Sequence, residues 1–257
     1  MHRRGKQCLF PSYIEPSTKK KVFNFSDVME KFKEDKPSEG YLCSRFNDKQ
    51  YILRLKRASV PCVLIGRFPF EKVNYVSCDN KQGAFSAVEH LIDLGHRRIG
   101  FISGSFDLIA GVERFEGYKI ALEKYNLEYN SELVIKGNWT REGGYQAMCE
   151  LLNKAKVPTA VFAANDQMAA GVVKAVKDKG FQIPKDIAIV GFSDTQFASY
   201  IEPPLTTVRE PTYKEGVIAA EMLVNLLSGE EVRRPQVILP TRLIIRKSCG
   251  YNGRNSK

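Results

Sequence analysis

Short runs of apolar residues alternate along the chain with longer stretches in which apolar residues recur every three or four positions. The short runs predict buried β-strands, and the longer stretches predict amphipathic helices. Regular alternation of the two is typical of βαβ units, which build a parallel sheet covered by helices. The pattern is clearest after residue 60 and predicts an α/β fold with parallel, doubly wound sheets.

The predicted strands follow the continuous apolar runs at 62–65, 74–78, 98–104, 133–135, 159–164, 187–192, 236–239 and 243–245. The predicted helices occupy 80–95, 113–125, 142–152, 166–179 and 213–227. Asn80 and Gly95 are expected to cap the first of these helices, since asparagine and glycine are favoured at the two ends. The proline-containing segment 203–208 is expected to be an extended connection.

The composition is that of an ordinary foldable protein, with 43% hydrophobic and 26% charged residues. No apolar run approaches the roughly 20 residues that a membrane span needs. The basic start of the chain is followed by no apolar stretch of the kind found in secretion signals, so a cytoplasmic protein without membrane association is expected. Residues 1–21 are basic and without periodicity, which predicts a poorly ordered segment, and residues 250–257 are expected to form a tail.

Six scattered cysteines form no C-x-x-C pair and have no histidine at metal-ligand spacing, so reduced thiols are expected. The formal net charge of +10 permits an attraction to nucleic acid. Solvated surface charge and basic tails are the other explanation, and the sequence leaves both open.

Patterns of catalytic residues are poor. The three histidines have no neighbouring nucleophile, and neither a G-x-S-x-G motif nor an H-E-x-x-H motif occurs. No nucleophile, base and orienting group can be assembled, so the sequence predicts a protein that is not an enzyme and has no cofactor and no metal site.

In open α/β sheets, ligands bind beyond the carboxyl ends of the strands. The predicted strands deliver polar residues to those ends: Gly66 and Arg67, Gly104 with the loop that leads to Arg114, Asn165 and Asp166, and Ser193 and Asp194. These groups suit hydroxyls, carboxylates or phosphates. Trp139, the single tryptophan, precedes a predicted helix, where its flat ring can stack on a pyranose or a base.

Each candidate also has a plainer explanation. Asn165 can be a simple helix cap, Arg114 a surface ion pair, and Trp139 an ordinary packing residue between helices.

Several motifs resemble those of the LacI/GalR family of transcription regulators. They are DNKQGA (79–84) with HLIDLGHRRIGFISG (90–104), ERFEGY (113–118), AANDQMAAG (163–171), PKDIAIVGF (184–192) and PPLTTV (203–208). Their order and spacing match the family over roughly residues 60–249.

The resemblance implies a two-lobed, periplasmic-binding-protein-like fold of type I, with an effector held between the lobes. One lobe is expected over 22–78 and 209–237, and the other over 79–208 and 238–249. It also implies a sugar- or small-metabolite-responsive regulator that works as a homodimer on operator DNA.

By the same resemblance, Arg114 corresponds to the effector-gripping arginine, Trp139 to the stacking aromatic and Asn165 to the hydroxyl-binding asparagine. Arg67 is a candidate from the facing lobe. Ser193 falls where many members place an aspartate. Because serine brings no charge, this departure leaves the identity of the effector open.

The N-terminal region departs further from the family pattern. The helix-turn-helix and hinge helix that enter DNA are not visible, and the first strand, helix and second strand of the N-terminal lobe have no counterpart. An incomplete lobe with an exposed sheet edge is therefore expected. Two other functions stay open: a solute-binding protein of a sugar importer, and a truncated regulator that no longer binds DNA.

Overall fold

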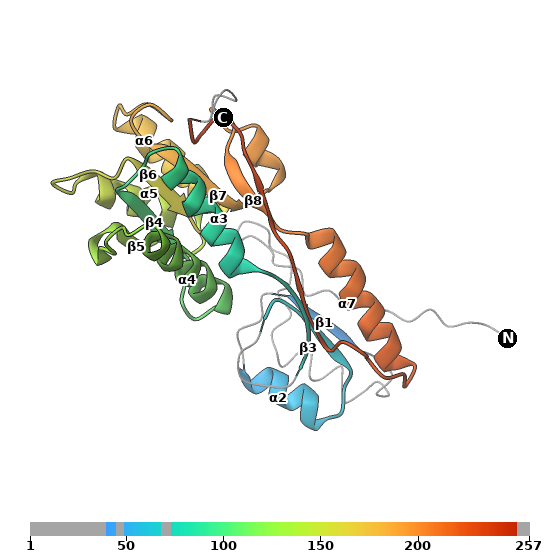
Figure 1. Ribbon diagram of the computed structural model, residues 1–257. Helices are drawn as coiled ribbons and strands as arrows, with labels where there is room; N and C mark the ends of the chain where they lie inside the picture. Colours follow the sequence, from blue (N-terminus) through green and yellow to red (C-terminus); the bar gives the residue numbers. More distant parts are fainter. Residues whose placement is uncertain (1–39, 45–48, 68–72, 251–257) are drawn as a thin grey trace, which may run out of the picture. The chain divides into compact units, whose positions relative to one another are not determined.

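A computed structural model of the chain describes residues 40–44, 49–67 and 73–250, and the predictions for 1–21 and for the tail beyond 250 lie outside these residues. The chain forms two compact units (Figure 1). Unit 1 contains the described residues up to Ser77 together with Thr212–Ile238, and unit 2 contains Cys78–Pro211 and the described residues from Leu239 onward. The chain therefore passes from one unit to the other three times.

Unit 1 is built on a four-stranded sheet with the order β1-β2-β3-β9. Its strands are β1 (Tyr41–Ser44), β2 (Cys62–Ile65), β3 (Asn74–Cys78) and β9 (Gln236–Leu239). The pairs β1–β2 and β2–β3 are parallel. Helix α2 (Lys49–Arg57) connects β1 to β2, and α7 (Thr212–Leu227) packs on both of these strands.

Residues alternate between the two faces of this sheet along β1 and at Gly40, which directly precedes it. Tyr41 and Cys43 join Ile52 of α2 in one buried cluster. Gly40 lies against Leu223 of α7, where a Cβ atom would come within 2.6 Å of the leucine side chain. Within the described residues, β1 has a neighbouring strand on one side only, so it forms an edge of the sheet.

Unit 2 is built on a six-stranded sheet with the order β10-β8-β7-β6-β4-β5. Its strands are β4 (Ile99–Ser103), β5 (Val134–Lys136), β6 (Ala160–Ala163), β7 (Ala188–Ser193), β8 (Thr206–Arg209) and β10 (Arg242–Ile244). All neighbouring strands are parallel except β10, which runs antiparallel to β8. Its helices are α3 (Asn80–Asp93), α4 (Ile109–Lys124), α5 (Arg141–Leu152) and α6 (Asp166–Asp178), with single turns at Ser131–Leu133 and Gln196–Ser199.

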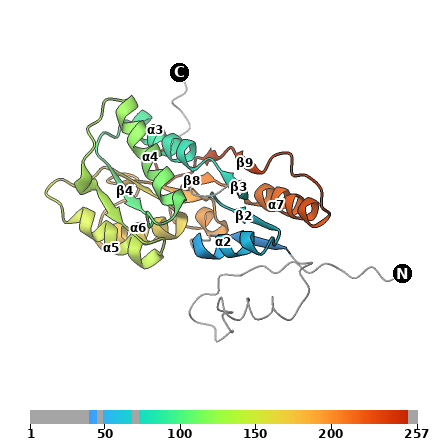
Figure 2. The ribbon, with the colours of Figure 1, turned by 90° about the horizontal axis from the view of Figure 1, so that it is seen from below.

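Two helices cover each face of this sheet, α3 and α4 on one and α5 and α6 on the other (Figure 2). Successive residues of β4 show why, because side chains alternate between the faces of a strand. Gly100 lies against Leu151 of α5, whereas the Phe101 ring stacks on Tyr118 of α4 at 5.2 Å between ring centroids. The predicted α/β fold with parallel sheets is confirmed.

Two details of the predicted elements are wrong. The cap of α3 is Asp79, whose side chain accepts a hydrogen bond from the Gln82 N–H, and Asn80 is instead buried inside the unit. The segment expected to be only an extended connection contains strand β8, which pairs with β7 and β10.

Helices α5 and α6 approach closely because glycines stand at their contact. A Cβ atom on Gly171 would overlap the Arg141 carbonyl oxygen and lie 2.6 Å from the Tyr145 nitrogen. Both of these atoms belong to the backbone of α5, which cannot move aside locally. The glycine therefore fixes the distance between the two helices.

We expect Gly171→Ala to lower the free energy of unfolding by about 1–3 kcal/mol, because the added methyl group forces α5 and α6 apart. The matched control is Gly216→Ala in α7, where a Cβ atom has nothing within 4 Å. That variant should gain about 0.5–1 kcal/mol from helix propensity. Urea denaturation followed by circular dichroism measures both, and equal effects in the two helices would contradict the packing argument.

Candidate functional site

Arg114 of α4 is the centre of a buried polar network in unit 2, with 5% of its surface exposed. Its Nε donates to the Asn80 Oδ1 at 2.9 Å, and its Nη1 donates to the Ala164 carbonyl oxygen at 2.6 Å. Its Nη2 forms an ion pair with the Glu210 carboxylate. A guanidinium group has five N–H donors, so these three bonds leave one N–H on each terminal nitrogen.

Aromatic rings hold the same guanidinium group in place. Its central carbon lies 3.6 Å from the centroid of the Phe192 ring and 5.7 Å from that of Trp139. A cation over an aromatic face is attracted by the ring quadrupole, and more strongly when both are out of water. Phe192 itself fits because α3 has Gly83 beside it, where a Cβ atom would lie 2.8 Å from the ring.

Asn80 joins Arg114 to a second acidic side chain. Its Oδ1 accepts from Arg114, while its Nδ2 donates to the Glu113 Oε2 at 3.0 Å and to the Cys78 carbonyl oxygen at 3.4 Å. The amide orientation is thereby fixed, since its oxygen must face a donor and its nitrogen two acceptors. The side chain expected to cap a helix therefore organises this network instead.

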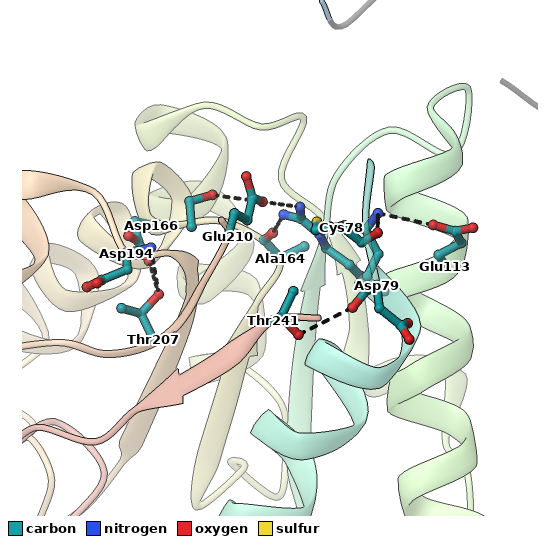
Figure 3. Close-up of polar contacts among 12 residues, drawn as sticks. Cys78, Asp79, Glu113, Ala164, Asp166, Asp194, Thr207, Glu210 and Thr241 are labelled. Atoms are coloured by element: carbon teal, nitrogen blue, oxygen red, sulfur yellow. Dashed lines mark hydrogen bonds and ion pairs between the residues drawn. The ribbon is translucent and has the colours of Figure 1, made fainter. Parts of the chain in front are cut away.

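Glu210 follows strand β8 and connects Arg114 to Ser193 at the end of β7. The Ser193 hydroxyl donates to the Glu210 Oε1 at 3.3 Å, and this oxygen also pairs with Arg114 (Figure 3). Serine at this position brings no charge of its own. The carboxylate that its hydroxyl contacts belongs to Glu210, which directly follows the neighbouring strand β8.

Trp139 and Asn165 lie next to each other. The Asn165 Oδ1 accepts from the Met168 N–H at 2.8 Å and caps α6, while its Nδ2 donates to the Trp139 carbonyl oxygen at 3.1 Å. The indole ring rests on Gly104, which leaves no room for a Cβ atom there. The buried Trp139 Nε1 has no hydrogen-bond partner among the described residues.

Backbone strain is concentrated around these side chains. Asn138 and Trp139 both have positive φ angles, +53° and +66°, and so do Ser193 and Asp194, at +120° and +53°. Left-handed backbone is unfavourable for residues with a Cβ atom and is kept where the surrounding structure requires it. The first pair begins two residues after β5, and the second begins with the last residue of β7. Strained backbone of this kind is common at ligand sites.

Asp166 has no exposed surface and accepts hydrogen bonds from three groups of the neighbouring segments. These are the Thr195 N–H at 2.7 Å, the Thr195 hydroxyl at 2.9 Å and the Thr207 hydroxyl at 2.6 Å. Burial raises the pKa of this carboxyl group, although the three hydrogen bonds oppose the shift. In this structure the Asp166 carboxylate joins the start of α6 to the segments at Thr195 and Thr207.

Asp194 is held by two arginines. Its carboxylate accepts from the Arg209 Nε and the Arg246 Nη2, each at 2.6 Å. Burial alone would raise the pKa of this carboxyl group, but the hydrogen bonds from Arg246 and Arg209 outweigh burial and hold it below its ordinary value. One carboxylate thus binds both arginine side chains within the unit.

Five of the six residues predicted from the sequence belong to unit 2. Arg114, Trp139, Asn165 and Ser193 belong to one connected set, and Asp166 follows Asn165. Arg67 is exposed and belongs to unit 1. The Arg114 ion pair is buried, so the explanation of a surface ion pair is wrong, whereas Asn165 does cap a helix.

Sequence reasoning missed Asn80 and Glu210. Glu210 directly follows a strand, so the rule that selected the other candidates would have found it if 206–209 had been identified as a strand. Nothing in the sequence separates the role of Asn80 from that of an ordinary cap.

The described residues contain no cluster of three or more histidine, cysteine or acidic side chains that could hold a metal ion. The five cysteines among them are all free thiols. None of the described helices is both long and apolar enough to cross a membrane.

Comparisons with known proteins agree on one family. A family model described as a periplasmic binding protein-like domain matches residues 88–249. The HTH-type transcriptional regulator CelR of Thermobifida fusca is 39% identical over 222 residues, which are 81% of this chain and 65% of CelR. The HTH-type transcriptional repressor PurR of Histophilus somni is 31% identical over 231 residues, which are 89% of this chain and 68% of PurR.

Solved structures give the same result. A LacI-family regulatory protein from Chloroflexus aggregans matches with a TM-score of 0.78 and 32% identity, over 87% of this chain and 80% of that protein. The chain belongs to the LacI family. A CelR–cellobiose complex matches with a TM-score of 0.78 and 39% identity, over 81% of this chain and 65% of that chain. This LacI-family chain thus spans about 65% of the length of CelR.

The two ion pairs of Asp194, with Arg209 and Arg246, should make the stability of the fold depend on pH. Because the pKa of Asp194 is lowered by folding, its contribution is fully present above the ordinary pKa and is lost as the pH falls through the lowered value. We therefore expect Asp194→Asn to reduce stability at pH 7, with the difference from the wild type shrinking below about pH 4. Urea midpoints across this range measure the effect.

The control is Asp178→Asn, which removes an exposed ion pair with Lys174 whose carboxylate pKa is also lowered. It should change stability little at any pH, because solvent screens exposed pairs. If the difference in urea midpoint between Asp194→Asn and the wild type stayed constant with pH, it would contradict a stabilising role of the two Asp194 ion pairs.

Proposed function

We propose that this chain is the effector-sensing core of a sugar- or small-metabolite-responsive transcription regulator. One observation carries the proposal: the buried guanidinium group of Arg114 keeps two N–H donors beyond its internal bonds. Trp139 lies beside it, and Ser193 is joined to it through Glu210. Hydrogen-bond donors next to a flat aromatic ring suit a ligand that has hydroxyls on its edge and an apolar face.

Each side chain has a definite part in this proposal. Arg114 donates to effector oxygens, the Ser193 hydroxyl donates or accepts, and the Trp139 ring packs on the face of the ligand. Asn165 uses one amide hydrogen and one lone pair in bonds within the unit, so it retains one of each for the effector. Arg67 and Asp166, and the lobe boundaries 22–78 plus 209–237 and 79–208 plus 238–249, stay predictions.

The relatives give the proposal its biological setting. CelR, PurR and catabolite control protein A are named as transcriptional regulators, repressors or control proteins, and a CelR structure contains cellobiose. We therefore propose that binding of a sugar or related metabolite controls operator binding by the whole protein, as a cytoplasmic homodimer. The effector would act by favouring one of two conformations, which requires it to bind that conformation more tightly.

The test is isothermal titration of the chain with a panel of neutral mono- and disaccharides, cellobiose included. Arg114→Lys should weaken any affinity found by at least about tenfold, since lysine cannot reproduce the planar fork of donors. Trp139→Ala should weaken it similarly by removing the stacking face.

The matched control is Arg141→Lys, an exposed arginine at the start of α5, which should leave the affinity unchanged. Thermal unfolding of each variant separates loss of binding from loss of fold. Full affinity in both Arg114→Lys and Trp139→Ala would refute the assignment of the site.

A further inference from the structure

The charge of Arg114 is already compensated inside unit 2. Glu210 pairs with it directly, and the Arg114 and Glu210 side chains are 7% and 16% exposed. Glu113 adds a second carboxylate, held by the same Asn80 that accepts from Arg114. Two carboxylates thus belong to this network, and one of them contacts the guanidinium group directly.

Two further arginines of unit 2 are held by a carboxylate other than Glu210. Arg209, at the end of β8, and Arg246 both bind Asp194, whose side chain is 5% exposed. An anionic group brought to Arg114 would meet the carboxylate of Glu210, which already pairs with the guanidinium group. Like charges in a partly buried site repel strongly, because little water screens them.

A neutral compound with hydroxyl groups can bond to both charged side chains without repulsion. Its oxygens can accept from the two remaining N–H groups of Arg114, while its hydroxyl hydrogens can be donated to the carboxylate of Glu210. Hydrogen bonds between a charged group and a hydroxyl are stronger than those between neutral groups. The pair of opposite charges thus matches a ligand that both donates and accepts but carries no charge.

We propose that Glu210 is a specificity-determining residue that makes this site select uncharged, polyhydroxylated effectors and reject their anionic counterparts. It provides the carboxylate beside Ser193, whose own side chain is neutral. This inference rests on the proposed function, because it concerns the ligand that binds at Arg114.

The experiment compares matched probes on the whole chain: neutral sugars and the same sugars carrying a carboxylate or a phosphate, measured by isothermal titration. The wild type should bind a neutral sugar at least about tenfold more tightly than its anionic counterpart. In Glu210→Gln this preference should shrink by at least about tenfold, chiefly through tighter binding of the anionic probe. In Glu210→Asp, which keeps the charge, the preference for the neutral probe should remain.

The ratio of the two affinities is measured within each variant. A variant that is partly unfolded loses both affinities equally, so its ratio stays valid. The control Glu116→Gln removes an exposed carboxylate that pairs with Lys81, and its ratio should equal that of the wild type.

Two results overturn the inference while the proposed function stands: equal wild-type affinities for both kinds of probe, or an unchanged ratio in Glu210→Gln. If the wild type binds no probe of either kind, the proposed sugar-sensing function fails and the inference fails with it.

Discussion

Unit 2 is organised around one constraint, a guanidinium group that has been removed from water. An unpaired buried charge costs several kcal/mol, and the loss of one partner from a buried pair costs about 3–5 kcal/mol. Arg114 avoids this cost through acceptors on three separate segments: Asn80 at the start of α3, Ala164 directly after β6 and Glu210 after β8. These segments must therefore be in place together for the arginine to be tolerated.

The same network reaches the points at which the chain leaves unit 2. Asn80 binds the carbonyl oxygen of Cys78, the first residue after one crossing, and Glu210 stands two residues before another. Next to Asn80, the Asp79 N–H donates to the Leu239 carbonyl oxygen at the third crossing. The network of Arg114 is therefore linked to residues at which the chain passes between the two units.

The parallel sheet explains why such a site forms here. Parallel strands end at one edge, and the residues that follow them need not continue the ladder of hydrogen bonds. Strained backbone at Asn138–Trp139 and Ser193–Asp194 turns side chains at this edge, and glycine at 104 makes room for the indole ring. The rigid core beneath supports this strain, since β6 and the inward face of α6 are buried. The positions of the side chains at this edge thus depend on the packing of the core residues in β6 and α6.

The sequence by itself determined the alternation of strands and helices and the edge of the sheet where polar residues gather, because both follow from local periodicity and from the geometry of parallel strands. It also selected Arg114, Trp139, Asn165 and Ser193. Only the tertiary structure decided that Arg114 is buried and that Asn80 and Glu210 are its partners. These contacts join residues 34 and 96 positions apart, and no local pattern encodes which distant side chain completes a buried charge.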